Sequence, residues 1–407
     1  MLHYNVVSQL VEALGDVFVH GYYVDKVLMH RFKDHPKWGA RDRKQFAETY
    51  YEIVRWWRWH WYLAGLPDED CLVKEKITRE RAWLVFGAYW VTKTTHVPDF
   101  SECSSLNADH VRFRGETQVA PAIRASIPDW LNAVGKEELS GEWPDLLRAL
   151  NRPAEVFLRT NTTKIQPKPL AINLIQEEID TMMVPGLPDA LKLIKRQSVF
   201  GTNCFKAGLF EVQDGASQMV APFLQVEPGM RVIDACAGAG GKTLHLACLM
   251  KNKGLIQAMD LLPWKLDELR KRFRRNEITC IQPELITSPT TIVRFNKKAD
   301  RVLLDVPCSG LGVLRRNPDT KWKLSPGELD RLRGIQADIL KNYSTMTKPG
   351  GKLVYATCSV LPSENQDQVK RFLDEHQDEW ILEEEKSWTP NVNGFDGFYA
   401  ARLARKA

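Results

Sequence analysis

The feature that most constrains this chain is a regular alternation of short apolar runs and amphipathic stretches after about residue 211. The runs MRVIDACA, GLIQAMD, DRVLLDVP and GKLVYATCSV have the length of buried strands. Between them lie the helical stretches KTLHLACLMK, Pro263 to about Arg275, and SPGELDRLRGIQADILKNYSTM. A further helix is expected to open at Pro362, and WILEEE and FYAARLAR indicate two closing strands. This order predicts a mostly parallel, doubly wound α/β sheet with ligands at the carboxyl ends of its strands.

The first half of the chain has a different pattern. Helical spacing of apolar residues near the start indicates an all-α region, and the residues that carry it are Val7, Leu10, Val11, Leu14 and Phe18. A helix capped by Asp42 is expected to run to Trp57, and another covers Glu80 to Thr92. The strand-like AEVFLRTN and the helical LAINLIQEEI then indicate a small α+β region. We therefore expect three domains, at residues 1–150, 151–210 and 211–407.

Four tryptophans crowd one stretch of the helical region, namely Trp56, Trp57, Trp59 and Trp61. The expected role of these side chains is to pack a small helical core and its rim. A surface on which nucleic-acid bases stack is the alternative.

Composition limits the partners and the compartment. Lys plus Arg is 56 and Asp plus Glu is 51, so the net charge of +5 permits an anionic partner without requiring one. The 8 cysteines are scattered without zinc spacing, so no metal site is expected. We find no signal peptide and no apolar run long enough to span a membrane. These features favour a cytoplasmic protein with free thiols and no membrane partner.

The loop DACAGAGGKT follows the first of the later strands. Its glycines, Gly238, Gly240 and Gly241, let the backbone approach a ligand closely. Cys236 stands where a phosphate-binding Walker loop needs glycine, and Thr243 stands where the dinucleotide fingerprint needs its last glycine. What remains is a strand, a glycine turn and a helix, with Asp260 at the end of the next strand. That carboxylate can hold the hydroxyls of a ribose, which favours an adenosine-type cofactor over a merely tight turn.

Two cysteines follow the ends of two later strands. Cys308 and Cys358 are 50 residues apart with one long helix between them, which is typical of neighbouring parallel strands. Both thiols should therefore face one crevice, near Asp305. A thiolate can attack an electron-poor ring carbon, while a second thiol and a carboxylate handle protons. Thiolate addition at carbon 6 of cytosine would make carbon 5 able to accept a methyl group. Two structural cysteines are the alternative.

Residues 155–407 closely resemble the RNA cytosine-5 methyltransferases called RsmB, Fmu or Sun. The resemblance rests on FLRTNT, GLFEVQDGASQ, DACAGAGGKT, LLDVPCSGLGVLRRNPDTKW, YATCSVLPSEN and DGFYAARL. It implies a Rossmann-like methyltransferase fold, S-adenosylmethionine as cofactor, Cys358 as nucleophile and Cys308 as the group that helps to release the product. It also implies that Lys242 and Asp305 contact the cytosine ring. The residues implied along the methyl donor are Asp234, Cys236, Ala237, Gly238, Ala239, Gly240, Gly241, Lys242, Asp260 and Asp305.

The chain departs from the family pattern at two places. Gly238 and Ala239 replace the Ala-Pro that relatives often carry in the glycine loop. An acidic residue usually follows the third strand, but here ELITSPTT offers Thr287 and Ser288 instead. This difference bears on how the adenine of the cofactor is held.

The segment ARDRKQFAETYYEIVRWWRW resembles part of the NusB-like helical domain of this family, which favours a cytosine of small-subunit (16S) ribosomal RNA as substrate. Of two basic clusters, LDELRKRFRRN is expected to be a solvated helix face. The second follows Cys308 and supplies the candidate RNA contacts Arg315, Arg316, Lys321 and Trp322. The protein is expected to be a monomer. Transfer RNA as substrate, a non-catalytic ribosome-assembly factor, and methylation of a nucleobase amine are the alternatives.

Overall fold

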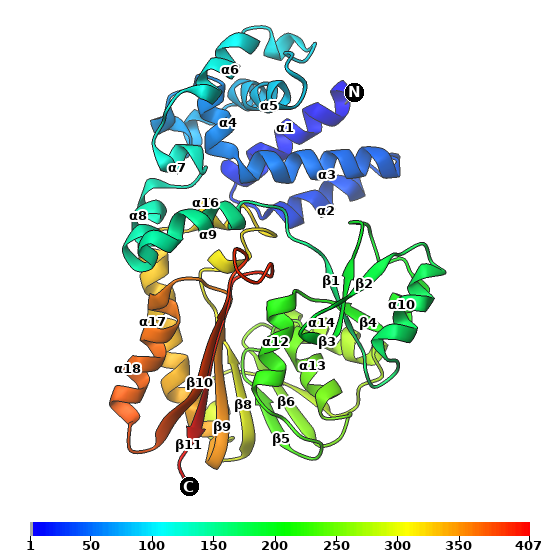
Figure 1. The fold of residues 1–407 in the computed structure, drawn as a ribbon, viewed down its shortest axis with the longest axis vertical. Coiled ribbons are helices and arrows are strands. Elements are labelled where there is room, and N and C mark those ends of the chain that lie inside the picture. The colour runs from blue at the N-terminus through cyan, green and yellow to red at the C-terminus, as the bar shows by residue number, and fades with distance from the viewer. Residues whose placement is uncertain (1–2) are drawn as a thin grey trace. The chain divides into compact units, whose positions relative to one another are not determined.

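The computed structural model describes residues 3–407, which form two compact units. The helical unit comprises the residues up to Arg152 together with Leu314–Pro326, and the sheet unit comprises Pro153–Val313 and Gly327–Ala407 (Figure 1). The boundary at Arg152 lies beside the one expected near residue 150. The return of Leu314–Pro326 to the helical unit is a feature that sequence patterns do not predict, and the small α+β region lies in the same compact unit as the large sheet.

The helical unit consists of short helices around an aromatic core. The helices are α1 (Tyr4–Phe18), α2 (Val24–Asp34), α3 (Ala40–Arg55), α4 (Trp57–Leu63), α5 (Arg79–Thr94), α6 (Ala108–Glu116), α7 (Pro121–Arg124), α8 (Asp129–Leu139), α9 (Trp143–Leu150) and α16 (Thr320–Lys323). The predicted apolar stripe of α1 is buried throughout. Asp42 is not a cap, because Gly39 precedes the first residue of α3 and Asp42 lies in the first turn. The predicted helix also breaks at Trp56, and α4 begins at the next residue.

The four crowded tryptophans divide into two pairs. Trp57 and Trp61 are fully buried in the core of the helical unit, which confirms the packing interpretation for these two. Trp56 and Trp59 are only partly buried. Their partial exposure leaves the alternative of a stacking surface open.

The sheet unit begins with a small antiparallel sheet in the order β2-β3-β1-β4. Its elements are β1 (Phe157–Thr160), α10 (Pro167–Ile175), β2 (Thr181–Val184), β3 (Leu187–Leu193), α11 (Asn203–Lys206) and β4 (Phe210–Val212). Helix α10 begins earlier than LAINLIQEEI suggested, because Pro167 suits a first helical turn. Leu158, Leu170 and Leu191 form part of the apolar core under this sheet.

The large sheet has seven strands in the order β10-β11-β9-β8-β5-β6-β7. Its elements are α12 (Gly215–Phe223), β5 (Arg231–Asp234), α13 (Gly241–Leu249), β6 (Leu255–Asp260), α14 (Pro263–Arg275), β7 (Ile281–Leu285), α15 (Pro289–Val293), β8 (Ala299–Asp305), α17 (Pro326–Tyr343), β9 (Thr347–Thr357), α18 (Gln366–His376), β10 (Trp380–Trp388) and β11 (Phe398–Arg405). Strands β5 to β9 are parallel, and β11 runs antiparallel to both of its neighbours, β9 and β10. The predicted doubly wound sheet is therefore confirmed.

Helices cover both faces of this sheet (Figure 1). Leu244 of α13 and Leu269 of α14 pack in the core of one face, and Ile339 of α17 and Phe372 of α18 pack in the core of the other. The helix expected to open at Pro362 begins later, at Gln366, because Pro362 lies in a short 3-10 turn. Within residues 3–407, no helix combines the length and the apolar character needed to cross a bilayer.

Candidate active site

The glycine loop joins the end of β5 to the start of α13, beside the point where the chain switches direction across the sheet. From β5 the chain continues to β6 and β7 on one side, and it later returns to β8 and β9 on the other. Gly240 has a φ of 87°, and an added Cβ would lie 2.1 Å from Leu269 Cδ1. This position therefore requires glycine on both conformational and steric grounds. The switch point is where open α/β sheets bind their ligands.

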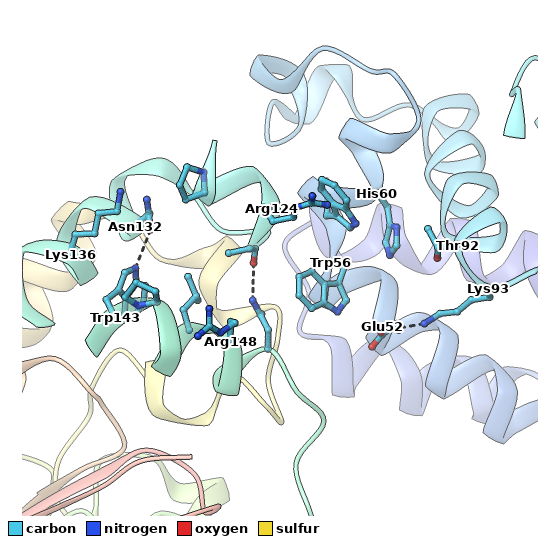
Figure 2. Close-up of a pocket in the computed structure, with 16 residues that line it drawn as sticks. Glu52, Trp56, His60, Thr92, Lys93, Arg124, Asn132, Lys136, Trp143 and Arg148 are labelled. Carbon is cyan, nitrogen blue, oxygen red and sulfur yellow. Dashed lines mark hydrogen bonds and ion pairs between the residues drawn. The ribbon is translucent and has the colours of Figure 1, made fainter. Parts of the chain in front are cut away.

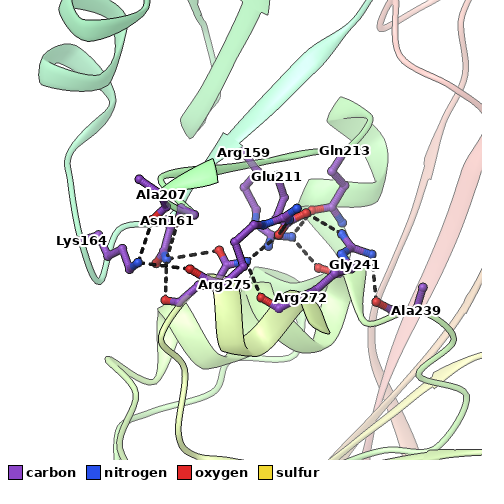
Figure 3. Close-up of polar contacts among 12 residues, drawn as sticks. Arg159, Asn161, Lys164, Ala207, Glu211, Gln213, Ala239, Gly241, Arg272 and Arg275 are labelled. Atoms are coloured by element: carbon purple, nitrogen blue, oxygen red, sulfur yellow. Dashed lines mark hydrogen bonds and ion pairs between the residues drawn. The ribbon is translucent and has the colours of Figure 1, made fainter. Parts of the chain in front are cut away.

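A buried polar network ties the glycine loop to the small sheet (Figure 3). Arg159 of β1 is 2% exposed and donates to the carbonyl of Gly241 and to Gln213 Oε1. Arg272 of α14 donates to the carbonyl of Ala239 over 2.8 Å, and its other terminal nitrogen pairs with Glu211 of β4 at 2.8 Å. Two strands of the small sheet thus help to hold the second half of the loop, at Ala239 and Gly241.

Glu211 explains part of the basic run in α14. Its carboxylate accepts from Arg272, Arg275 and Asn276. Burial opposes ionisation of Glu211, but the two arginines hold its pKa below the usual value. The expected solvated face of LDELRKRFRRN therefore needs a correction at Arg272 and Arg275, which serve this internal network.

Two carboxylates lie beside the glycine loop. Asp260, at the end of β6, accepts from the backbone N–H of Gly238 and of Leu262, each over 2.9 Å. Asp234, at the end of β5, accepts from Thr243 Oγ1 at 2.6 Å. Its Oδ1 is buried and has no hydrogen-bond partner among residues 3–407. Burial raises the pKa of Asp234 to about 7, and the nearby carboxylates of Asp305 and Asp260 act in the same direction.

These features fit an adenosine cofactor at the loop. The orphaned oxygen of Asp234 is a buried acceptor that a ligand N–H can satisfy. Gly238 has a φ of 55° with no atom within 4 Å of the position that a Cβ would take, so the backbone is open to a ligand there. The Cys236 thiol is held protonated, because burial raises its pKa well above the usual value. Cys236 is therefore an uncharged side chain of the loop and not a second nucleophile.

The segment after β7 contains hydroxyls where relatives usually carry an acid, as the sequence indicates. The backbone N–H of Ile286 donates to the carbonyl of Asp260 at 3.0 Å, which places this segment beside the glycine loop. Thr287 and Ser288 follow, and their hydroxyls lie near those of Thr291 and Thr290. The acidic residue closest to Thr287 in the sequence is Glu284, and it is paired with Arg294. The segment that follows β7 therefore carries neutral hydroxyl groups beside the glycine loop.

Lys242 and Asp305 form an ion pair at the same edge of the sheet. Lys242 Nζ lies 2.6 Å from Asp305 Oδ2, and the side chains are 10% and 29% exposed. Lys242 belongs to the first turn of α13, and Asp305 ends β8, the strand paired with β5. The ammonium also lies 5.0 Å from the centre of the Phe398 ring. This pair offers a donor and an acceptor for a polar ring at the switch point.

The two cysteines meet as the strand order predicts. Strands β8 and β9 are parallel neighbours, with Asp305 opposite Ala356. Cys308 and Cys358 follow those ends, and their sulfur atoms lie 3.3 Å apart. Contact with Cys358, together with burial, raises the pKa of Cys308 well above the usual value. Cys308 is thus the thiol that keeps its proton, and it can donate that proton towards Cys358.

A buried glutamate that sequence reasoning missed holds the two cysteine loops together. Glu364 is fully buried and accepts from the Ser309 N–H at 2.8 Å, from Ser309 Oγ at 2.5 Å and from Ser359 Oγ. Gln336 of α17 donates to the same carboxylate at 2.9 Å. Ser309 and Ser359 each follow a cysteine directly. The only signal in the sequence was the motif YATCSVLPSEN, which contains this glutamate without indicating its partners.

The predicted RNA contacts after Cys308 require a correction. Lys321 is fully buried in the helical unit, where its ammonium donates to the Arg55 carbonyl at 2.8 Å and to Asn151 Oδ1 at 3.0 Å. Trp322 donates from its indole to the Val54 carbonyl at 2.7 Å, and Arg315 is 8% exposed. We therefore withdraw Lys321, Trp322 and Arg315 as RNA contacts. Only Arg316, which is partly exposed, stays a prediction.

The sheet order, the glycine loop and the carboxylates at the strand ends define a Rossmann-like methyltransferase. The family described as 16S rRNA methyltransferase RsmB/F matches residues 221–404, and its ferredoxin-like domain matches residues 127–200. The Ribosomal RNA small subunit methyltransferase B of Shewanella oneidensis is 33% identical over 98% of this chain and 99% of its own length. The chain therefore belongs to the RsmB/F family of 16S ribosomal RNA methyltransferases.

Solved structures agree on the fold. A crystal structure of PH0851 has a TM-score of 0.80 at 24% identity and covers 97% of this chain and 98% of its own. NSun6 from Pyrococcus horikoshii, solved with SFG, has a TM-score of 0.63 at 20% identity and covers 69% of this chain and 98% of its own. SFG is an analogue of S-adenosylmethionine. The family membership confirms S-adenosylmethionine as the predicted cofactor.

Proposed function

We propose that this chain methylates carbon 5 of a cytosine in small-subunit ribosomal RNA through a covalent bond between Cys358 and the base. The observation that carries the proposal is the pair of thiols 3.3 Å apart at the switch point. Methylation of a nucleobase amine needs no such pair. The 33% identity to a small-subunit methyltransferase over nearly the whole chain supports the ribosomal substrate over transfer RNA.

The chemistry assigns different roles to the two thiols. The Cys358 thiolate adds to carbon 6 of cytosine, which makes carbon 5 electron-rich and able to form a new bond. When bound, S-adenosylmethionine supplies the electrophilic methyl group that carbon 5 accepts. The proton on carbon 5 must then leave, after which the bond between carbon 6 and Cys358 breaks and the thiolate departs. Cys308 can balance the protons of this release, because its sulfur lies 3.3 Å from that of Cys358. It passes its own proton to the departing Cys358 sulfur and takes up the proton that leaves carbon 5.

The ion pair of Lys242 and Asp305 supports recognition of cytosine. Cytosine offers an amino donor and ring acceptors, so a carboxylate and an ammonium at fixed positions can hold it in one orientation. Chemistry at a ring carbon further requires the base to leave its stack.

The remaining residues hold the methyl donor. Asp260 has acceptor capacity beyond its two backbone N–H partners, which suits the hydroxyls of a ribose. Asp234 contributes its orphaned oxygen, and the loop from Cys236 to Gly241 contributes backbone groups along the ligand. The hydroxyls of Thr287 and Ser288 stand where relatives carry an acid, and we assign them to the adenine side.

The direct test is to map the product on RNA. Purified protein, unmodified 16S ribosomal RNA and S-adenosylmethionine are incubated together, and bisulfite sequencing then locates any 5-methylcytosine. One methylated cytosine should appear with the wild-type chain and none with Cys358→Ala. A methylated amine would refute the chemistry, and methylation of transfer RNA in place of 16S RNA would refute the substrate. Full RNA binding without methylation would favour a non-catalytic assembly factor.

A further inference from the structure

The helical unit contains a groove that the proposed chemistry does not use. Its volume is about 640 Å³, within the range of sites that bind small organic groups. Residues of α3, α4 and α5 line one side, and residues of α7, α8 and α9 line the other (Figure 2). We call it the tryptophan groove and define it by Trp56, Trp59, Lys93, Arg124 and Lys136.

The groove presents aromatic surface that its neighbours do not cover. Trp56 and Trp59 are partly exposed, whereas Trp57 and Trp61 of the same stretch are sealed in the core. The Trp59 ring is already in contact with two side chains, since the guanidinium of Arg124 lies 4.6 Å from its centre and the Tyr62 ring stacks on it at 5.6 Å. Trp56 is therefore the indole on which a further ring can stack. Indole rings with an exposed face and an adjacent arginine are the combination on which unpaired bases stack.

The charge of the groove is positive. Four cations line it, namely Lys93, Arg124, Lys136 and Arg148, against the single carboxylate of Glu52. Lys93 lies 3.7 Å from Glu52, and Arg148 pairs with Asp145. Across residues 3–407, no carboxylate pairs with Arg124 or Lys136, and both side chains are exposed.

His60 adds no pH-dependent charge to the groove at neutral pH. Burial lowers its pKa to about 3, and Lys93 acts in the same direction. The imidazole packs edge-on against Tyr89 at 5.4 Å. The positive charge of the groove therefore comes from lysine and arginine alone, which keep their charge at any pH that the protein meets.

We propose that the tryptophan groove binds an unpaired nucleotide of RNA, with the base stacked on Trp56 and the flanking phosphates held by Arg124 and Lys136. This inference rests on the proposed function, since it takes the substrate to be RNA. Exposed lysines beside an open groove favour phosphate over protein, because lysine is depleted at the core of protein interfaces. A duplex is excluded because stacking on an indole needs an unpaired base.

The first experiment measures RNA binding by the full chain. A fluorescent single-stranded decaribonucleotide is titrated and followed by fluorescence anisotropy. Trp56→Ala should weaken binding about tenfold or more, the usual effect of removing one aromatic ring on which a base stacks. Phe113→Ala is the matched control, since Phe113 is 71% exposed in the same unit and does not line the groove. Equal affinity of Trp56→Ala and Phe113→Ala would overturn the inference.

Charge and stacking are separated by two further measurements. Lys136→Glu should weaken binding and reduce its salt dependence, whereas Lys44→Glu, an exposed lysine outside the groove, should change little. An abasic decamer should bind wild type and Trp56→Ala equally, because it has no base to stack. If Trp56→Ala weakens the abasic decamer as much as the normal one, the tryptophan does not stack on a base and the inference fails. Circular dichroism confirms that each variant is folded.

Turnover distinguishes this inference from the proposed function. Groove variants should raise the KM for RNA while leaving kcat and the affinity for S-adenosylmethionine unchanged. If the wild type binds the decamer through the groove but forms no 5-methylcytosine, the proposed function fails and the groove stands. If the wild type methylates RNA and the groove variants do so with the same KM, the groove inference fails alone. Groove variants that keep RNA affinity but lose binding to small-subunit ribosomal proteins would make it a protein-docking surface instead.

Discussion

The edge of the large sheet and the tryptophan groove hold their charged groups in opposite ways. At the sheet edge, Lys242 is paired with Asp305, and Glu364 accepts from groups on three segments. In the groove, Arg124 and Lys136 have no carboxylate partner among the described residues. Chemistry at a ring carbon needs groups fixed in place before the substrate arrives, whereas contact with a flexible anionic chain tolerates mobile cations. The comparison separates residues that should control kcat from residues that should control KM.

The largest expected effect is at the thiols. Cys358→Ala should abolish methylation and any covalent RNA adduct, because this variant lacks the proposed nucleophile. Cys308→Ala should still form the adduct but release it poorly, so a shifted protein–RNA band should accumulate on a denaturing gel. The reverse pattern, with an adduct in Cys358→Ala alone, would exchange the two roles. No groove variant should accumulate an adduct.

Glu364→Ala should lower kcat about 100-fold, since misplacement of reacting groups by 1 Å can cost that much. The loss arises because Ser309 and Ser359 lose the carboxylate that holds both cysteine loops. Single-turnover methylation measures the effect, and Glu375→Ala, an exposed acid on α18, is the control. Glu364→Gln should rescue little, because its amide places a donor against existing donors. An unchanged kcat in Glu364→Ala would show that the strands alone position the thiols.

Asp260→Ala should weaken S-adenosylmethionine binding by about 1–3 kcal/mol, the range for a lost partner of a buried polar group. Part of that loss would come from the Gly238 N–H, which Asp260 also holds. Calorimetry measures the affinity, and Asp267→Ala, an exposed acid on α14, is the control. Equal affinity in the two variants would remove Asp260 from the cofactor site.

The smallest expected effect on RNA affinity is at Lys321. Lys321→Ala should leave decamer binding within about twofold of wild type, because its ammonium is buried and bonded within the helical unit. It should instead lower the free energy of unfolding by about 1–3 kcal/mol, since Asn151 and the Arg55 carbonyl lose their donor. Urea denaturation measures this loss, with Lys44→Ala as the exposed control. A large drop in RNA affinity with unchanged stability would return Lys321 to the RNA contacts.

The Lys321 result also affects truncation experiments. The helical unit includes Leu314–Pro326, so deletion of residues 1–150 would remove the Arg55 carbonyl that accepts from Lys321 and the Val54 carbonyl that accepts from Trp322. Point variants in the groove are therefore a cleaner test than truncation of how the helical unit contributes to RNA recognition.

Local chemistry let the sequence alone determine much of the sheet unit. Helix α14 has the predicted bounds, because Pro263 starts a helix and a run of good helix formers continues it to Arg275. The ends of the strands were equally predictable, since each apolar run stops at a polar residue such as Asp234, Asp260 or Asp305. Parallel strands bring their carboxyl ends to one edge, so the meeting of Cys308 with Cys358 followed from topology.

Only the tertiary structure decided where polar side chains find their partners. Arg315 and Lys321 lie close to Cys308 in sequence, yet the chain carries them into the helical unit and buries them there. Glu364 binds Ser309 across 55 residues, and the two walls of the tryptophan groove come from helices that no periodicity connects. Hydrophobic periodicity reports which face of an element is buried, but not against which distant element it packs. A buried polar group takes whichever partner the completed fold brings within about 3 Å, and that partner is set by the whole chain.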